Sequence, residues 1–213
     1  MKKTAFYLGL RKLWVAYKLI ARENSYLNQT GFIKSHQHIQ PIDKNKSPIP
    51  WMNYAMVEFL NERLNKALDL FEYGAGFSSI WFAERLNKVV SIEYDLAWRK
   101  QVEELLAPVS NAELVFQEVG EDYINGASKT GRKYHLVLVD GRERVACAKA
   151  SFSALTEDGV LILDDSDRAE YQEVFSIAKD LGYKNLRISG LKPFSFFREE
   201  STIFYRSSNC LGL

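Results

Sequence analysis

Glu72-Tyr73-Gly74-Ala75-Gly76-Phe77-Ser78 is the most informative stretch of the chain. The apolar run of residues 68–73 predicts a short strand that ends at Gly74, and residues 78–86 predict a helix with Ser78 as its cap. Glycines directly after a strand let the backbone turn tightly and approach a ligand, and the helix that follows presents free N–H groups there. The stretch therefore predicts a strand, a ligand-binding turn and a helix.

Strand and helix patterns alternate on both sides of this turn. Strands are predicted at residues 68–73, 89–93, 112–116, 134–140 and 159–164, and helices at 51–68, 78–86, 96–106, 146–155 and 169–181. Two last strands, 183–189 and 201–205, have no helix between them. Strands that are apolar on both faces and separated by helices indicate a parallel sheet covered on each side. The predicted fold class is thus α/β, a doubly wound, mostly parallel sheet.

The composition is that of one sizeable globular domain. The chain has 213 residues, of which 46% are hydrophobic and 26% are charged. Its net charge of +1 gives no general attraction to nucleic acid, so no nucleic-acid partner is expected. Cys147 and Cys210 stand far apart in unrelated contexts, which argues against a disulfide framework or a zinc cluster and favours a cytoplasmic location.

The first 22 residues predict an amphipathic helix. Phe6, Leu10, Leu13, Tyr17 and Ile20 recur at helical spacing, with basic residues between them. No stretch approaches the ~18 uncharged apolar residues that a membrane span requires. We favour a helix that packs on its own domain or on a second subunit, as in a homodimer; the alternative is peripheral contact of residues 1–22 with an anionic membrane.

Two glutamates beside the glycine turn indicate the kind of ligand. Glu72 directly precedes the glycines and would repel a pyrophosphate, and Ser79 stands where a dinucleotide-binding turn has its third glycine. Glu93 ends the next predicted strand, nineteen positions after Gly74, where a carboxylate accepts both hydrogen bonds of a ribose diol. Together these residues indicate an adenosine-type ligand whose tail is positive and lacks phosphate.

This pattern resembles that of class I S-adenosylmethionine-dependent methyltransferases, over roughly residues 68–205. The resemblance implies a Rossmann-like sheet of seven strands, with the final pair as its antiparallel edge. It also implies that Gly74 and Gly76 wrap the methionine part of S-adenosylmethionine, that Glu93 holds the ribose, and that Gln117 or Glu118 faces the adenine. Ser78 takes the place of the family's third glycine. The expected cofactor-binding residues are Glu72, Gly74, Gly76, Ser78, Glu93, Glu118 and Asp140.

Three aspartates follow later strands of the predicted sheet. Asp140 ends the fourth strand, and Asp164 and Asp165 end the fifth. Like charges gathered at the mouth of a cleft need a proton, a cation or an arginine between them. The arrangement resembles metal-dependent O-methyltransferases of the catechol and macrolide-sugar types, which implies that Asp140, Asp164 and Asp165 bind a divalent ion such as Mg2+.

An alternative without a metal has equal weight. Asp140 then acts as a general base or substrate clamp, Asp165 caps the next helix, and Arg142, Arg144 or Arg168 neutralises the cluster. In both interpretations Asp140 and Asp164 are the expected catalytic residues.

The segment of residues 48–54 precedes the predicted core at the place of a substrate lid, and Trp51 and Tyr54 are candidates for the acceptor pocket. Together with the motifs after the fourth and fifth strands, it resembles an uncharacterised bacterial methyltransferase-like group found beside glycan-modifying enzymes. The resemblance implies a small-molecule or glycan-type acceptor.

The sequence thus predicts two parts: residues 1–66 as an N-terminal helical extension with a lid, and residues 67–213 as an S-adenosylmethionine-binding domain that methylates a hydroxyl group. Three alternatives stay open. They are an NAD-dependent oxidoreductase, an aminopropyltransferase-like enzyme that uses decarboxylated S-adenosylmethionine, and a non-catalytic subunit with the same fold.

Overall fold

A computed structural model describes the backbone of residues 2–213 and the side chains from Tyr7 onward, so the Phe6 side chain of the predicted amphipathic face lies outside the described part. The strands are β1 (Asp69–Tyr73), β2 (Lys88–Glu93), β3 (Ala112–Phe116), β4 (Tyr134–Val139), β5 (Leu155–Leu163), β6 (Lys184–Gly190) and β7 (Glu199–Tyr205). The α-helices are α1 (Lys2–Ala21), α2 (Tyr26–Gln29), α3 (Phe32–His38), α4 (Tyr54–Asn61), α5 (Phe77–Arg85), α6 (Leu96–Leu106), α7 (Glu121–Ile124), α8 (Gly126–Lys129), α9 (Arg144–Ser151) and α10 (Gln172–Asp180). Two 3-10 turns, Phe152–Ala154 and Ala169–Tyr171, precede β5 and α10.

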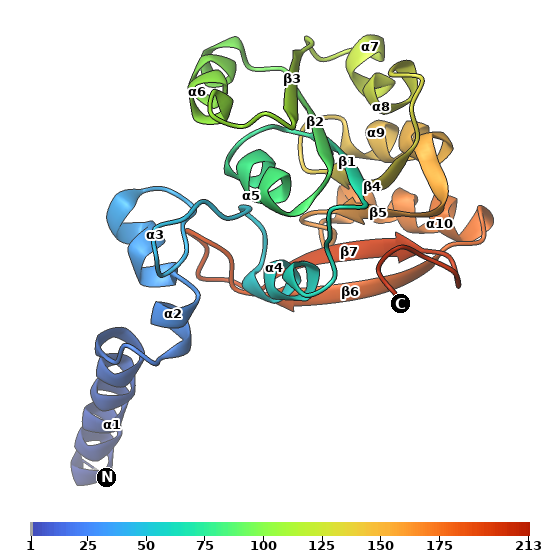
Figure 1. Cartoon of the computed structure of the whole chain (residues 1–213). Helices are drawn as coiled ribbons and strands as arrows, with labels where there is room; N and C mark the ends of the chain where they lie inside the picture. Colours follow the sequence, from blue (N-terminus) through green and yellow to red (C-terminus); the bar gives the residue numbers. More distant parts are fainter. Residues whose placement is uncertain (1) are drawn as a thin grey trace.

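The strands form one seven-stranded sheet in the order β3-β2-β1-β4-β5-β7-β6 (Figure 1). Strands β1 to β5 pair in parallel, whereas β7 runs antiparallel to both β5 and β6. The predicted fold class, a doubly wound and mostly parallel seven-stranded sheet, is confirmed. From β1 the chain continues to β2 and β3 on one side of the sheet, and from β4 it continues to β5 on the other side. In sheets of this kind a ligand crevice is expected at the carboxyl ends of the two neighbouring strands between which the direction changes, here β1 and β4.

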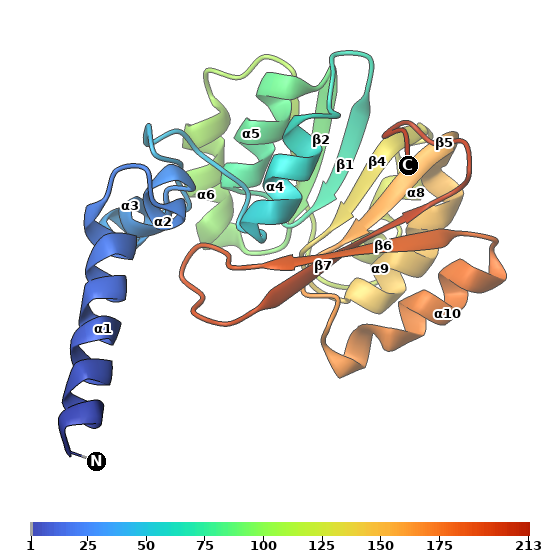
Figure 2. The ribbon, with the colours of Figure 1, turned by 90° about the horizontal axis from the view of Figure 1, so that it is seen from below.

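Alternate side chains of the central strands enter two separate cores. Leu70 and Leu138 pack with residues of α4 and α5, and Phe71 and Val139 pack with residues of α8, α9 and α10. Figures 1 and 2 show these two groups of helices on opposite faces of the sheet. Because both faces are covered, the strands appear in the sequence as continuous apolar runs.

Helix α1 extends away from the sheet and its covering helices (Figure 2). Leu10, Leu13 and Tyr17 of its predicted apolar face are exposed to solvent. The expectation that α1 packs on its own domain is therefore wrong, and packing on a second subunit stays a prediction. Within residues 2–213, no helix is long and apolar enough to cross a membrane.

The predicted helix of residues 51–68 is much shorter in the structure. Asn53 caps α4 by accepting a hydrogen bond of 2.9 Å from the backbone N–H of Met56. After α4 the chain turns, and the Lys66 ammonium donates to the carbonyls of Ala83 and Leu86 at 2.9 Å each. These contacts at the end of α5 are distant in sequence, so hydrophobic periodicity alone could not show where α4 ends.

Candidate active site

A cavity of about 620 Å3 lies at the carboxyl ends of β1, β2 and β4. One half of its lining comes from the glycine turn and from the segment that follows β2, namely Gly74 to Ser78, Glu93, Tyr94, Asp95 and Trp98. The other half comes from the chain after β4, namely Asp140, Gly141, Arg142 and Arg144, and from residues of other segments, namely Ile39, Pro41, Trp51 and Phe194.

The backbone of the glycine turn requires a glycine at position 74. Gly74 has a φ of +91°, and a Cβ there would lie 3.2 Å from the carbonyl oxygen of Asp140 and from the Cα of Gly141. Gly141 is constrained in another way, because a Cβ there would lie 2.1 Å from the Tyr123 hydroxyl and 3.2 Å from the backbone nitrogen of Gly74. These two glycines let the loops after β1 and β4 approach each other closely. Gly76 is extended, and a Cβ there would make only an ordinary contact of 3.6 Å with Trp98.

Glu72 is buried beneath the glycine turn and does not line the cavity. Its Oε2 atom accepts hydrogen bonds from the hydroxyls of Ser79, at 2.5 Å, and Ser91, at 2.7 Å. The Ser79 hydroxyl also accepts a bond of 3.0 Å from the backbone N–H of Gly76, which is the N-cap of α5. The prediction that Ser78 caps this helix is thus wrong, although Ser78 does line the cavity. Burial raises the pKa of Glu72.

Glu93 lines the cavity and also joins β2 to the glycine turn. One of its carboxylate oxygens accepts from the backbone N–H groups of Tyr94 and Asp95, both at 2.8 Å, and the other accepts from Ala75 at 3.1 Å. Burial raises the pKa of Glu93, and these backbone bonds oppose the shift. Trp98 donates a further bond of 2.7 Å to the carbonyl of Ala75. Trp98 had no signal in the sequence beyond its place in the predicted helix.

The two residues expected near an adenine lie elsewhere. Glu118 is exposed beyond the end of β3 and does not line the 620 Å3 cavity. Gln117 lines a separate cavity of about 250 Å3. Tyr94 and Asp95, which follow β2 in the chain, do line the 620 Å3 cavity.

The three predicted aspartates do come together. One carboxylate oxygen from each of Asp140, Asp164 and Asp165 lies within 4.8 Å of the others. Arg144 Nη2 is 2.8 Å from Asp140 Oδ1, and Arg168 Nη2 is 2.5 Å from Asp165 Oδ2. The cluster therefore contains cationic side chains of the chain itself.

Lys192, from the loop between β6 and β7, completes the neutralisation. Its ammonium contacts Asp165 Oδ1 and lies 3.7 Å from Asp164 Oδ2. Three carboxylates thus meet three cations, Arg144, Arg168 and Lys192. Because these cations already contact the carboxylates, the arrangement as it stands does not fit Mg2+, although Asp164 Oδ2 is a buried oxygen without a hydrogen-bond partner. The geometry favours the alternative without a metal, with Lys192 as a partner that the sequence analysis missed. Arg142 is not part of the cluster, because its Nε donates to the Tyr94 hydroxyl at 2.9 Å.

The environments of the three carboxyl groups differ. Burial and the charge of Asp164 raise the pKa of Asp140, the member that lines the cavity. Burial also raises the pKa of Asp164, whose Oδ1 accepts a bond of 2.5 Å from the Ser201 hydroxyl. Although burial opposes the shift, the hydrogen bond and charge of Lys192 lower the pKa of Asp165. Asp140 is therefore the carboxyl group best placed to take up a proton from a molecule in the cavity.

The predicted lid contributes one of its two candidate aromatic residues. Trp51 is half exposed and lines the cavity, and its indole N–H donates to the carbonyl of Pro193 at 2.7 Å. Phe194 packs edge-on against Trp51 at a ring distance of 5.1 Å. Tyr54, the first residue of α4, is instead buried in the core, so it is not available to an acceptor.

The protein has the fold of class I S-adenosylmethionine-dependent methyltransferases. It is similar to a methyltransferase-like protein from Silicibacter pomeroyi, with 25% identity, a TM-score of 0.53, and 75% of this chain and 89% of that chain covered. It is also similar to precorrin-6y C5,15-methyltransferase from Geobacter metallireducens, with 16% identity, a TM-score of 0.54, and 71% and 88% covered. An O-methyltransferase from Bacillus cereus in complex with SAH shares 13% identity, with a TM-score of 0.53 and 65% and 73% covered. No protein-family model and no curated protein matches the sequence.

Proposed function

We propose that this protein is an S-adenosylmethionine-dependent methyltransferase that methylates a hydroxyl group of a small-molecule or sugar-like acceptor. One observation carries the proposal: a single cavity contains the glycine turn, the Glu93 carboxylate and the Asp140 carboxylate. A cofactor and an acceptor bound in its two halves would meet at the end of β4. This close placement of two reactants is the main contribution that such an enzyme makes to catalysis.

The half beside β1 and β2 suits the cofactor. The Glu93 oxygens can accept from a ribose diol as well as from the backbone, and the backbone at Gly74 and Gly76 lets the methionine portion approach closely. The half of the lining that contains this turn holds the carboxylates of Glu93 and Asp95 and no Lys or Arg, whereas Arg142 and Arg144 belong to the other half. This distribution of charge favours a sulfonium ligand over the pyrophosphate of NAD. S-adenosylmethionine supplies an electrophilic methyl group. We assign its binding to residues 67–213, and we assign the lid to residues 1–66.

Asp140 is the proposed base. Its raised pKa brings its proton affinity closer to that of an activated hydroxyl group, which favours proton transfer as the methyl group arrives. Arg144 holds one of its oxygens at 2.8 Å, so the carboxylate keeps a fixed orientation toward the cavity. Asp164 has a positioning role through Lys192 and Ser201, and the mechanism requires no metal ion.

The half beneath the lid suits an acceptor with a flat apolar face. Trp51 and Phe194 present ring surfaces there, and Arg142 adds hydrogen-bond donors at the rim. Sugar rings and other small hydroxylated molecules combine such faces with polar groups, which matches this lining.

Calorimetric titration of the cofactor-free protein with S-adenosylhomocysteine, with NAD and with decarboxylated S-adenosylmethionine tests the proposal. We expect S-adenosylhomocysteine to bind with an affinity that added Mg2+ does not change. We also expect it to bind more tightly than NAD and decarboxylated S-adenosylmethionine. Binding of NAD alone would establish the oxidoreductase alternative. Preference for the decarboxylated cofactor would indicate aminopropyl transfer. Binding of none of the three would favour a non-catalytic subunit and overturn the proposal.

A further inference from the structure

The N-terminal segment has a charge pattern unlike that of the rest of the chain. Residues 1–22 contain six Lys and Arg and no Asp or Glu. Of the 28 Lys and Arg in the chain, 22 therefore stand in residues 23–213, against all 27 Asp and Glu. The near-zero net charge of the protein conceals a basic helix attached to an acidic body.

Helix α1 combines these charges with an exposed apolar stripe. Leu13, Trp14 and Tyr17 are 69%, 56% and 66% exposed, and Leu10 and Ile20 extend the stripe in both directions at helical spacing. On another side of the helix, Arg11 and Lys18 stand seven residues apart, which aligns them in a basic row, and Arg22 follows directly after the last residue of the helix, Ala21. The Lys18 ammonium also lies 3.8 Å above the ring of Trp14, at the border between the two surfaces.

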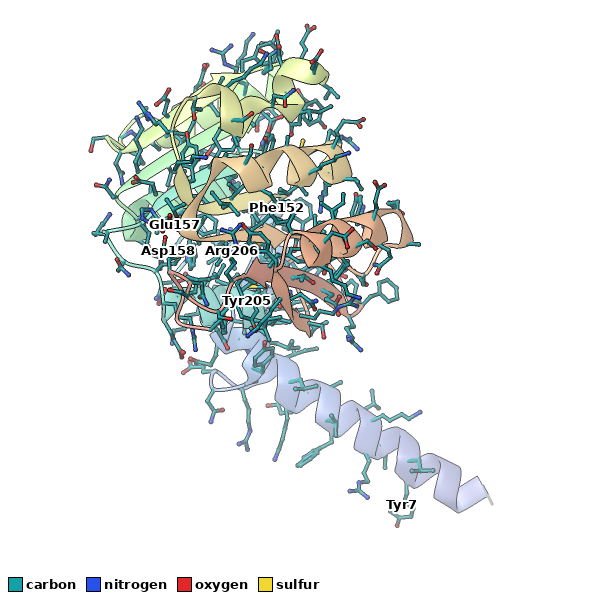
Figure 3. The ribbon with its side chains drawn as sticks, turned by 90° about the vertical axis from the view of Figure 1, so that its right-hand side faces the viewer. Tyr7, Phe152, Glu157, Asp158, Tyr205 and Arg206 are labelled. Atoms are coloured by element: carbon teal, nitrogen blue, oxygen red, sulfur yellow. The ribbon has the colours of Figure 1, made fainter. Side chains whose placement is uncertain are left out.

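The body of the protein holds the end of α1 firmly. Ser25 Oγ donates to the carbonyl of Leu19 at 2.7 Å, and the Asn28 amide donates to the carbonyls of Ile20 and Arg22 at 2.7 and 2.9 Å. These bonds satisfy carbonyl groups that a helix end leaves unpaired. Helix α1 is thus fastened at its end, and Figure 3 shows Tyr7 well clear of the body.

Apolar surface continues from α1 to the active-site mouth. A cavity of about 500 Å3 at the end of α1 is lined mostly by hydrophobic side chains, among them Ile20, Phe32 and Phe196. Phe196 and Phe197 are 72% and 77% exposed on the loop between β6 and β7. His36 stacks on Phe196 at 5.0 Å and meets the ring of Phe194, which lines the 620 Å3 cavity, at 5.6 Å.

We propose that α1 and the aromatic loop Phe194–Phe197 form a docking surface for an anionic lipid membrane. The basic row would face the lipid headgroups while the apolar stripe enters the boundary with the acyl chains, where tryptophan and tyrosine are favoured. Charge favours this occupant over the pairing of α1 with α1 of a second copy, because two such helices would bring only like charges together. Docking in this way brings the mouth of the active-site cavity close to the bilayer surface. Docking of this kind does not depend on methyl transfer.

Cosedimentation of the full-length protein with lipid vesicles tests this docking surface. We expect binding to vesicles of phosphatidylcholine mixed with phosphatidylglycerol, little binding to phosphatidylcholine alone, and weaker binding as salt is added. Replacing Arg11, Lys12 and Lys18 together by Glu should weaken binding by about a hundred-fold or more, since each basic residue near such a surface contributes about a factor of five. Replacing Lys100, Lys179 and Lys184 by Glu makes the same charge change on exposed residues of the body and should leave binding nearly intact.

A second variant separates apolar insertion from charge. Leu13→Ser with Trp14→Ser keeps every charge and should also abolish most vesicle binding, with an unchanged unfolding temperature because both side chains are exposed. Equal binding of wild type and either α1 variant would contradict the proposal, as would equal binding to neutral and anionic vesicles. A wild-type dimer that becomes a monomer in the Leu13→Ser, Trp14→Ser variant, without vesicle binding, would instead establish a second copy as the partner.

Discussion

The indole N–H of Trp98 donates a hydrogen bond of 2.7 Å to the carbonyl of Ala75, while the Glu93 carboxylate accepts one of 3.1 Å from the N–H of the same residue. Both polar backbone groups at the centre of the glycine turn are therefore bound by residues at and just after the end of β2. Partners of this kind give the turn its shape before any ligand arrives, which lowers the entropic cost of binding.

Trp98→Phe tests this preorganisation. The phenyl ring retains much of the packing but cannot donate to Ala75, so we expect S-adenosylhomocysteine to bind about 0.5–1.5 kcal/mol more weakly. Calorimetric titration measures the change, and Trp14→Phe on the distant helix α1 is the matched control. If Trp98→Phe binds as tightly as wild type, the indole bond has no part in shaping the site.

Glu93→Gln tests the proposed ribose contact. The amide keeps one acceptor oxygen and replaces the other by a donor, so it cannot accept a charged pair of hydrogen bonds, and the loss expected is about 1.5–3 kcal/mol of S-adenosylhomocysteine affinity. Glu118→Gln is the same substitution at the residue that lies outside the cavity, and it should change nothing. A larger effect at Glu118 than at Glu93 would reverse the assignment.

The parts of this site that the sequence revealed are local, and the parts that it concealed depend on distant contacts. The glycine turn, Glu93 and the three aspartates each end a strand, and parallel strands necessarily bring their carboxyl ends to one edge. Lys192 lies in the loop before the antiparallel strand β7, so only the folded sheet brings it to Asp165. Without Lys192, the sequence could not show whether a metal ion or cationic side chains neutralise the three aspartates.

Two other errors have similar physical origins. Ser78 and Ser79 offer the same hydroxyl group near the start of α5. Only the fold shows that the N-cap is Gly76 and that the Ser79 hydroxyl accepts from the Gly76 N–H while it donates to the buried Glu72. The aromatic periodicity of α1 correctly predicted a helix, but a pattern of spacing does not identify what covers the apolar side.

Lys192→Met tests the neutralised acidic cluster. The substitution takes away the cation that lies 3.7 Å from the buried Asp164 carboxylate and one of the cations that contact Asp165. We therefore expect a loss of about 3–5 kcal/mol in the free energy of unfolding, measured by urea denaturation. Lys88→Met removes the same charge from an exposed pair with Glu113 and should cost less than about 1 kcal/mol. Equal small losses in the two variants would show that Lys192 does not neutralise the cluster.

Asp140→Asn tests the proposed base. With an acceptor found by screening hydroxylated compounds against labelled S-adenosylmethionine, we expect the transfer rate to fall about 10²- to 10⁴-fold, because the amide cannot take up the proton. Affinity for S-adenosylhomocysteine should change little. A metal chelator should leave the wild-type rate unchanged; a rate that disappears with chelator and returns with Mg2+ would restore the metal interpretation of Asp140, Asp164 and Asp165.

Glu72→Gln predicts a specific change in how stability depends on pH. Burial raises the pKa of Glu72 above its ordinary value of 4.5, so its protonated form is favoured in the folded state. The resulting stability is fully present below pH 4.5 and is lost as the pH rises through the raised pKa. Glutamine can accept the bonds from Ser79 and Ser91 without a charge, so the variant should lose less stability than wild type over this rise in pH.

Glu113→Gln supplies the opposite sign in the same experiment. The hydrogen bond of Lys88 lowers the pKa of Glu113, so its contribution is present above pH 4.5 and is lost as the pH falls. Unfolding temperatures measured from about pH 4 to about pH 8 should therefore show the Glu72→Gln curve rising relative to wild type toward high pH, and the Glu113→Gln curve falling slightly. Parallel curves for Glu72→Gln and wild type would mean that Glu72 titrates normally and that its burial beneath the turn carries no electrostatic cost.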